Sequence, residues 1–467
     1  MTGRTLEARQ REIDMKDVRT DSRARAHLFE TVLAPVQAFF RLEAASGLLL
    51  LGCAVAALAW ANVAPASYRA VFATPVTIGA AGTVARFTLL ALVNDGLMAL
   101  FFFVVGMEIK RELVHGELRT LPQALLPAIA AAGGMVVPAA IFLAFNAGGP
   151  GVPGWGIPMA TDIAFCIGVL TLLRRRVPHA LVVFVTALAI FDDLGGILVI
   201  ALFYGSGLHA PWLLAAGAVG AAAILLSRAG VRSGLAWATV GALLWYALHG
   251  AGIHATIAGV ILGLAIPARP RRPLREVIAD LSEHVGDLLR AAEDEERDEA
   301  AVEGIEERLE ELEAPLTRFV HALHPWVAFG IMPLFALANS GVELSSLDRS
   351  QLTGDVAVGA AIALFAGKQV GIFVFTLAAV RSGLARIPGD ASPVKLLGVS
   401  IVAGVGFTVA LFIAGLAYPT TPRLLDEAKL GILAGSLASG LAGALVLRAT
   451  PRVGAATGAK RAADAPA

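Results

Sequence analysis

Two adjacent aspartates interrupt a strongly apolar stretch of the sequence. Asp192 and Asp193 follow the run ALVVFVTALA and precede the run ILVIALF. Carboxylate oxygens are hard ligands, which suit hard cations such as Na⁺ or Li⁺. The same oxygens cannot hold a proton and a metal ion well at once. Because the two ligands compete, the pair is predicted to exchange a cation for protons, with Asp193 and Asp192 as the Na⁺-binding residues.

Three further ionisable residues fall in apolar stretches, namely Asp95, Asp162 and Lys368. One charged residue in the middle of a membrane helix costs about 2.5–3.5 kcal/mol, so these groups indicate a function, with a purely structural network as the alternative. Neighbouring helical residues point about 100° apart. One adjacent acid should therefore face a central cavity and the other a neighbouring helix. Repulsion and desolvation favour the protonated carboxyl, and Lys368 opposes this, so we expect proton exchange near neutral pH.

The elements that carry these residues are predicted from length and composition. Of the 467 residues, 57% are hydrophobic and 16% are charged, which is too apolar for an ordinary soluble protein. A membrane-spanning helix needs roughly 20 mostly apolar residues. The sequence therefore predicts an all-α polytopic membrane protein with about 12 transmembrane helices. The predicted spans are 44–63, 86–108, 122–146, 156–173, 179–204, 211–228, 233–249, 252–268, 323–341, 356–380, 394–418 and 429–448.

Loop charges predict the orientation of these spans. Arginine and lysine are concentrated in alternate loops, which the positive-inside rule assigns to the cytoplasm together with both termini. The charged segment 1–43 lacks the apolar core of a signal peptide and is expected to be a cytoplasmic extension. The formal net charge is zero, so nothing indicates a nucleic-acid partner. The two cysteines, Cys53 and Cys166, both fall in predicted spans and form no disulfide framework.

The transmembrane domain (44–448) carries three distinctive appended segments. In 270–318, apolar residues recur at helical spacing on both sides of the acidic run EDEERDE, which predicts a cytoplasmic amphipathic hairpin. This insertion is either an inert packing element or a regulatory one. The tail 449–467 is rich in alanine and glycine and is expected to be disordered. Segment 64–85 has a weak β-hairpin pattern and is otherwise an irregular loop.

Two predicted spans contain residues that break helices. The span 156–173 contains Pro158, Thr161 and Asp162. The span 394–418 contains Gly404, Gly406 and Thr408. Each span is the middle member of a three-span unit of matching layout, which predicts inverted repeats with two broken, crossing helices. If the N-termini of the half-helices meet, Asp162 would offset their positive partial charges; if the C-termini meet, Lys368 would offset the negative ones.

Several stretches are specific enough to indicate a family. They are NDGLMALFFFVVGMEIKREL (94–113), GGMVVPA (133–139), ATDIAFCIGVL (160–170), ALAIFDDLGGI (187–197), GIHATIAGVILG (252–263), LHPWVAFGIMPLFALANSGV (323–342), GKQVGI (367–372) and GFTVALFIAGLAY (406–418). In this order, the chain closely resembles the NhaA family of Na⁺/H⁺ antiporters.

The resemblance implies the function. The chain is expected to be a secondary active transporter rather than an enzyme. It would exchange Na⁺ or Li⁺ for protons electrogenically and under pH control, by alternating access of a core bundle against an interface bundle. It would need no cofactor beyond the transported Na⁺, Li⁺ and H⁺. The expected location is the bacterial inner membrane, with lipid as a partner and a homodimer formed through the 64–85 hairpin.

The resemblance also implies roles for particular residues. Asp193 resembles the principal cation ligand, and Asp192 its partner, which pairs with Lys368. Thr161 and Asp162 match the unwound helix at the crossing. The residues that match the family's pH-sensing cytoplasmic funnel are Glu108, Arg111, Glu112, His254, His321 and His324. The sequence departs from the family in two places, because Val320 replaces a glutamate and the 270–318 insertion is unusually long.

Other functions are open from the residues alone. A cation-coupled solute symporter on the same scaffold is the main alternative. An intramembrane aspartyl protease would need a Gly-x-Gly-Asp context, and a Mg²⁺-dependent prenyl-type enzyme a third acid, neither of which FDDLGG supplies. Cys166, one helical turn after Asp162, is expected to border the cation path.

Overall fold

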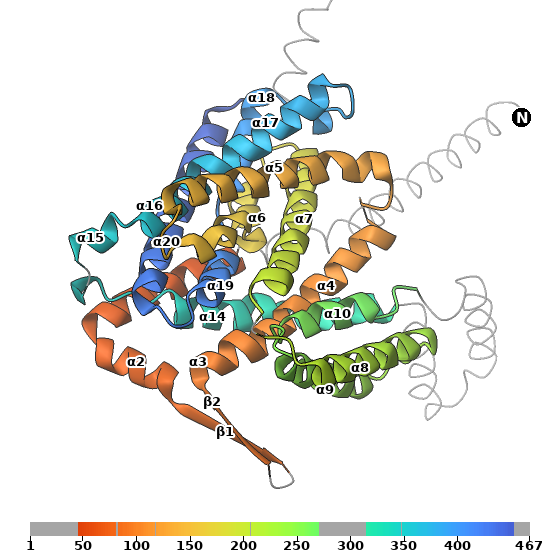
Figure 1. Ribbon diagram of the computed structural model, residues 1–467. Helices are drawn as coiled ribbons and strands as arrows, with labels where there is room; N and C mark the ends of the chain where they lie inside the picture. The colour runs from red at the N-terminus through yellow and green to blue at the C-terminus, as the bar shows by residue number, and fades with distance from the viewer. Residues whose placement is uncertain are drawn as a thin grey trace, which may run out of the picture.

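Figure 1 shows a computed structural model of the chain, which describes residues 45–452 except 81–82, 117, 206, 270–313 and 347. The predicted N-terminal extension (1–43) lies outside the described residues. So do residues 270–313 of the predicted insertion and the predicted tail from 453 onward.

The apolar stretches of the sequence form the long helices. Five of these are single elements: α5 (Leu121–Asn146), α7 (His179–Phe203), α8 (Ala210–Arg228), α9 (Gly234–Gly250) and α20 (Pro422–Ala449). A helix at Ala45–Val63 precedes them. The shorter α10 (Ile257–Ala265) follows α9.

The other spans are composite. One consists of α3 (Leu89–Ala91), η1 (Leu92–Leu97) and α4 (Met98–Val114), and the next of η2 (Val152–Met159) and α6 (Ile163–Leu172). Another consists of α13 (Pro315–Trp326), η3 (Val327–Ile331) and α14 (Met332–Asn339), and it is followed by α16 (Asp355–Ile362), η5 (Ala363–Gly367) and α17 (Lys368–Arg381). The last of these composite spans consists of α18 (Pro393–Val402) and α19 (Phe407–Ala417). Here η1, η3 and η5 are π-helical turns, a form that is frequent at functional sites. Short turns η4 (Leu344–Ser346), α15 (Arg349–Leu352) and η6 (Pro388–Asp390) lie in loops.

The span prediction agrees with these helices, although the number twelve is not reached. Each predicted range contains helix. Among the described residues, nine helices are long and apolar enough to cross a membrane, and α18 with α19, bent by 46°, adds a tenth. With 17 and 9 residues, α9 and α10 are too short for that test.

The helices pack as two groups. The first group is built on α5, which contacts α7, α16 and α17, and on α20, which contacts α16, α18 and α19. The second group is built on α4, which contacts α10 and α13, with α8 and α9 packed beside α10. In Figure 1, α8, α9 and α10 lie together beside α4 and away from α16, α17 and α18.

The first group contains the predicted repeat. Its first half runs α5, η2–α6, α7, and its second half runs α16–α17, α18–α19, α20. Both middle spans are broken where the sequence predicts, at residues 160–162 and 403–406. The two breaks touch, because the backbone N–H of Asp162 donates to the carbonyl of Val405 at 2.7 Å.

The segment after the first helix contains the predicted hairpin, in which β1 (Pro75–Ala80) pairs antiparallel with β2 (Thr83–Thr88). Only the bounds 64–85 are corrected, because α2 (Pro65–Ala73) occupies the first part of that range. Pro65 suits the first turn of a helix because its missing N–H is not needed there. Because β2 extends to Thr88, the next span begins at Leu89 rather than at 86. The Phe87 ring packs 6.4 Å from that of Trp245 in α9.

The end of the predicted insertion is also corrected. Helix α13 begins at Pro315, so the last residues of the range 270–318 belong to a membrane helix. Its first turn is fixed by the backbone, because the N–H of Leu316 donates to the carbonyl of Pro267 at 3.1 Å.

Candidate cation and proton site

The N-terminal ends of two half-helices meet on Asp162. This residue is the N-cap of α6, where its Oδ1 accepts a hydrogen bond from the backbone N–H of Phe165 at 3.1 Å. Its Oδ2 accepts from the hydroxyl and the backbone N–H of Thr408, in the first turn of α19, at 2.6 and 3.2 Å. Helix N-termini carry positive partial charge. A buried carboxylate between them is therefore well placed to offset both.

Lys368 contacts the C-terminal end of the half-helix η2. Its Nζ donates to the carbonyl of Met159, the last residue of η2. The same Nζ lies 2.8 Å from Asp192 Oδ2, and both side chains are 0% exposed. Thr161 Oγ1 lies 2.7 Å from Asp192 Oδ2 and 3.1 Å from the carbonyl of Ala403. The predicted contact between Lys368 and Asp192 is therefore present, and it also joins α17 to α7.

Asp193 is not part of this ion pair. It lines a cavity together with Thr161, Asp162 and Thr408. Its side chain is buried, and its Oδ1 has no hydrogen-bond partner among the described residues. Asp192 Oδ1 also has none, but Asp192 does not line this cavity. The two adjacent acids thus face different surroundings, as their angular separation on a helix requires.

The cavity lies between the two helix groups and has a charged end. Val104, Val105 and Glu108 of α4 line one side, and α7 and α19 line the other. At the charged end, Glu108 Oε1 is 3.4 Å from His324 Nδ1, and Arg111 Nε is 3.9 Å from Glu112 Oε1. The structure thus brings four of the six predicted pH-sensing residues to one cavity wall.

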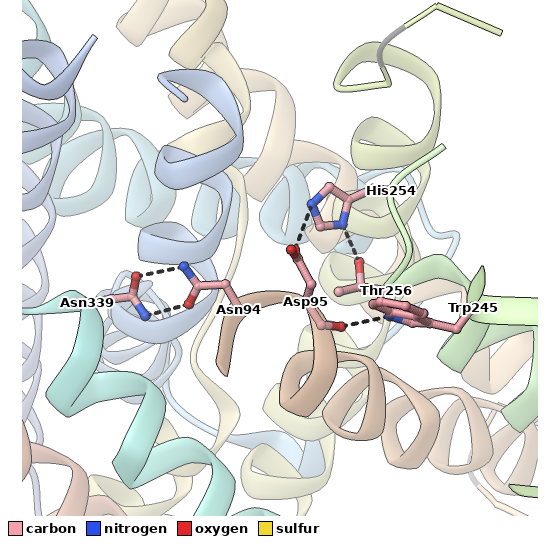
Figure 2. A network of polar contacts seen from close by, with 6 residues as sticks. All are labelled: Asn94, Asp95, Trp245, His254, Thr256 and Asn339. Carbon is pink, nitrogen blue, oxygen red and sulfur yellow. Dashed lines mark hydrogen bonds and ion pairs between the residues drawn. The ribbon is translucent and has the colours of Figure 1, made fainter. Parts of the chain in front are cut away.

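The other two predicted pH-sensing residues lie elsewhere. His321 is exposed on α13 and does not line this cavity. His254 follows α9 and belongs to a separate polar network (Figure 2), where its Nε2 is 3.7 Å from Asp95 Oδ1 and its Nδ1 is 2.9 Å from Thr256 Oγ1. Neither His254 nor Asp95 lines the cavity of Asp193.

The network of Figure 2 fixes the π-helical turn η1. Trp245 Nε1 donates to the backbone carbonyl of Asp95 at 3.1 Å. Asn94, the residue before Asp95, exchanges two hydrogen bonds with Asn339 through their side-chain amides, at 2.8 and 3.2 Å. Asp95 is therefore a membrane acid with its own partners, and its role is separate from that of Asp193.

Sequence reasoning missed two hydroxyl residues on the cavity wall, Ser46 and Thr186, whereas it singled out Thr408 as part of a broken span. Each of the two missed residues is a lone polar residue in an apolar span, which is the only signal that the sequence gives. The expectation for Cys166 is not met in this structure, because its Sγ donates to the carbonyl of Val402 at 3.1 Å and the residue does not line the cavity. Val320 is buried in α13, where an apolar side chain packs without an unpaired charge.

The ligand chemistry around Asp193 is that of oxygen atoms. Within the described part of the chain, no three His, Cys, Asp or Glu side chains form a group that could hold a metal ion. The polar side chains that line the cavity with Asp193 at its inner end are those of Thr161, Asp162 and Thr408, which carry oxygen atoms.

Comparison with known proteins identifies the family. A sequence profile described as Na⁺/H⁺ antiporter 1 matches residues 37–447. The chain belongs to this family. The Na⁺/H⁺ antiporter NhaA of Anaeromyxobacter sp. (strain Fw109-5) is 69% identical over 428 residues, covering 91% of this chain and 93% of that protein. The Na⁺/H⁺ antiporter NhaA 1 of Myxococcus xanthus (strain DK1622) is 60% identical over 424 residues, covering 90% and 94%.

A more distant likeness is to the solved structure of the sodium proton antiporter MjNhaP1 from Methanocaldococcus jannaschii at pH 8. It has a TM-score of 0.43 and 16% identity over 77% of this chain and 86% of that chain, which is too low to add to the family assignment. As a member of the Na⁺/H⁺ antiporter 1 family, the chain is a multi-pass membrane protein that exchanges sodium for protons. It gives no support to the symporter alternative.

Proposed function

We propose that Na⁺ or Li⁺ and protons compete for Asp193 and that this competition couples their transport. The observation that carries the proposal is the buried Oδ1 of Asp193, which lacks a partner among the described residues and belongs to a cavity-lining carboxylate. Both oxygens of Asp162 are already engaged by backbone N–H groups and the Thr408 hydroxyl. We infer that Asp162 organises the crossing while Asp193 exchanges its ligand, with Thr161 beside it.

The ion pair of Lys368 and Asp192 supplies a second titratable unit. If one proton leaves Asp193 and another leaves this pair for each Na⁺ bound, one net charge crosses the membrane per cycle. Such electrogenic exchange is driven by the membrane potential, which is worth about 2.3 kcal/mol per charge at 100 mV.

Access to the site is proposed to alternate between the two faces of the bacterial inner membrane. The cavity between the helix groups has Glu108, Arg111, Glu112 and His324 at one end. We assign this end to the cytoplasm, together with both termini, from the positive-inside distribution of Arg and Lys. Movement of one helix group against the other would close this end and open the opposite one. Glutamate, arginine and histidine side chains at this end of the cavity support pH control of exchange.

The assignment of Asp193 is tested by a matched pair of acids. In everted vesicles with a pH-sensitive dye, Asp193→Asn should abolish Na⁺-induced loss of the acid gradient. An amide does not take up a proton at the pH of the assay, and it carries no negative charge to attract a cation. Asp95→Asn, which removes a membrane acid outside the cavity, should keep exchange. For the unmodified protein, the KM for Na⁺ should rise as pH falls, since protons then occupy Asp193. Full exchange by Asp193→Asn, or a requirement for an organic solute, would refute the proposal.

We further propose a homodimer that forms through the β1–β2 hairpin in the presence of membrane lipid. The hairpin is a two-stranded sheet, and such a sheet presents edges to which another strand can pair. A single cysteine at Val76, introduced after replacing Cys53 and Cys166, should cross-link between copies. A cysteine at exposed Leu235 of α9 should not. Equal cross-linking of both would contradict this interface. Neither a cofactor nor a nucleic-acid partner is part of the proposal.

A further inference from the structure

The cavity that leads to Asp193 is polar at its two ends and mainly apolar between them. The charged group lies at the mouth, and Thr161, Asp162, Asp193 and Thr408 lie at the inner end. Apart from these, the only polar side chains among the lining residues that the structure describes are Ser46 and Thr186. A cation that sheds water on this route has few oxygen atoms to replace it.

Thr186 lies on the same face of α7 as Asp193. Thr186, Ile190 and Asp193 have the spacing i, i+4, i+7 and all line the cavity. Residues at this spacing form one stripe along a helix, and seven residues rise about 10 Å. Successive spans alternate in direction, so the N-terminal end of α7 lies on the same side as the C-terminal end of α4, where Glu108 is. Thr186 therefore stands between the mouth and Asp193.

The hydroxyl of Thr186 is oriented to accept rather than to donate. Its Oγ1 donates to the carbonyl of Val182, four residues earlier, at 3.1 Å. A hydroxyl has one proton and two lone pairs. Because the proton is used within the helix, the lone pairs remain for the cavity. The hydroxyl of Thr408 has likewise given its proton to Asp162, so the wall presents acceptor oxygens, which suit a cation.

We propose that Thr186 is a relay ligand, an intermediate oxygen that binds the partly dehydrated Na⁺ or Li⁺ between the mouth and Asp193. This inference rests on the proposed exchange at Asp193 and adds a residue that determines how readily the ion enters. An intermediate ligand lowers the barrier to entry without taking part in the competition with protons. Its loss should therefore slow entry of the cation, which raises the KM for Na⁺ and leaves the exchange rate at saturating Na⁺ unchanged.

The test compares two threonines with the same local bonding. Thr376 of α17 also donates its hydroxyl to the carbonyl four residues earlier, that of Ile372 at 2.7 Å, but it does not line this cavity. In everted vesicles at fixed pH, we expect Thr186→Val to raise the KM for Na⁺ about tenfold, the size of one lost neutral contact, at unchanged maximal rate. Thr186→Ser should retain the unmodified KM, and so should Thr376→Val.

Each other outcome decides against the proposal. An unmodified KM in Thr186→Val refutes it, as does an equal rise in Thr376→Val or in Thr186→Ser. If Thr186→Val does not fold, as judged by thermal unfolding in detergent, Thr186→Ala against Thr186→Ser gives the same contrast. The two proposals fail in different ways. If the proposed function is wrong, Asp193→Asn will show full exchange, whatever the KM of the Thr186 variants. If only the role of Thr186 is wrong, Asp193→Asn will still lose exchange.

Discussion

At the scale of the residue, the ion pair of Lys368 and Asp192 is expected to stabilise the fold. Both side chains are fully buried and 2.8 Å apart. Removing one member of a buried pair leaves an uncompensated charge and costs about 3–5 kcal/mol, whereas replacing both with uncharged side chains is often nearly neutral. Lys368→Ala should therefore unfold at a clearly lower temperature than the unmodified protein. The double variant Lys368→Met with Asp192→Asn should recover most of the loss.

This prediction is checked by thermal unfolding in detergent, with Asp95→Asn as the control for loss of a membrane acid outside the pair. If Lys368→Ala unfolded at the unmodified temperature, the pair would contribute nothing to the fold. If the double variant were no more stable than the single one, the cost would come from lost packing rather than from the stranded charge.

At the scale of the element, the close approach of α5 and α17 brings Lys368 to its partner. A Cβ atom at Gly371, one turn after Lys368, would lie 2.1 Å from the carbonyl oxygen of Gly133. Backbone atoms cannot move aside as a flexible side chain does, so Gly371→Ala must separate the two helices. We expect this variant to lose stability, by about 1–3 kcal/mol as in overpacked cores, and to lose exchange.

The control for this prediction is Gly415 of α19, where an added Cβ would meet nothing within 4 Å. Gly415→Ala should keep the unfolding temperature and the exchange rate of the unmodified protein. Exchange at the unmodified rate in Gly371→Ala would mean that the contact between α5 and α17 does not hold the site.

The sequence predicts these elements better than it predicts their contacts. The broken spans, the different surroundings of Asp192 and Asp193, and the pairing of Lys368 with an acid follow from helix geometry and from the expense of buried charge. The particular groups that meet Asp162 and Lys368 at the helix ends do not, because the Thr408 N–H and the Met159 carbonyl are backbone groups, which the sequence pattern does not single out. The alternation in 64–85 predicts the β1–β2 hairpin but not α2 before it, because alternation does not reveal a helix that starts at Pro65. Thr186 is missed because one hydroxyl barely alters an apolar pattern.

At the scale of the whole molecule, the cavity lies between two helix groups that make few contacts of their own across it. Helix α4 on one side and α19 on the other meet through aromatic rings, with Phe102 and Phe412 5.5 Å apart. A contact between two rings has no hydrogen bond to break, which suits the proposed movement of one helix group against the other. The charged groups that define the site belong to the first group, and the titratable mouth belongs to the second.

Contacts on the two sides of the predicted insertion lead us to expect that it is separable from transport. The backbone N–H of Leu316 donates to the carbonyl of Pro267 at 3.1 Å. Arg318 Nη2 also donates to the carbonyl of Arg232, at 2.6 Å, so α13 is fixed by the membrane domain itself. Replacing 275–312 with a short Gly/Ser linker should therefore preserve folding and Na⁺-dependent exchange.

The pH profile of that replacement variant decides between the two interpretations of the insertion. Glu108 and His324, at the mouth of the Asp193 cavity, belong to α4 and α13, which lie outside 275–312. We therefore expect the pH of half-maximal exchange in everted vesicles to stay unchanged, as for an inert element. A shifted profile at unchanged maximal rate would assign pH regulation to the insertion, and an unfolded variant would show that the closed backbone stem does not suffice to hold α13.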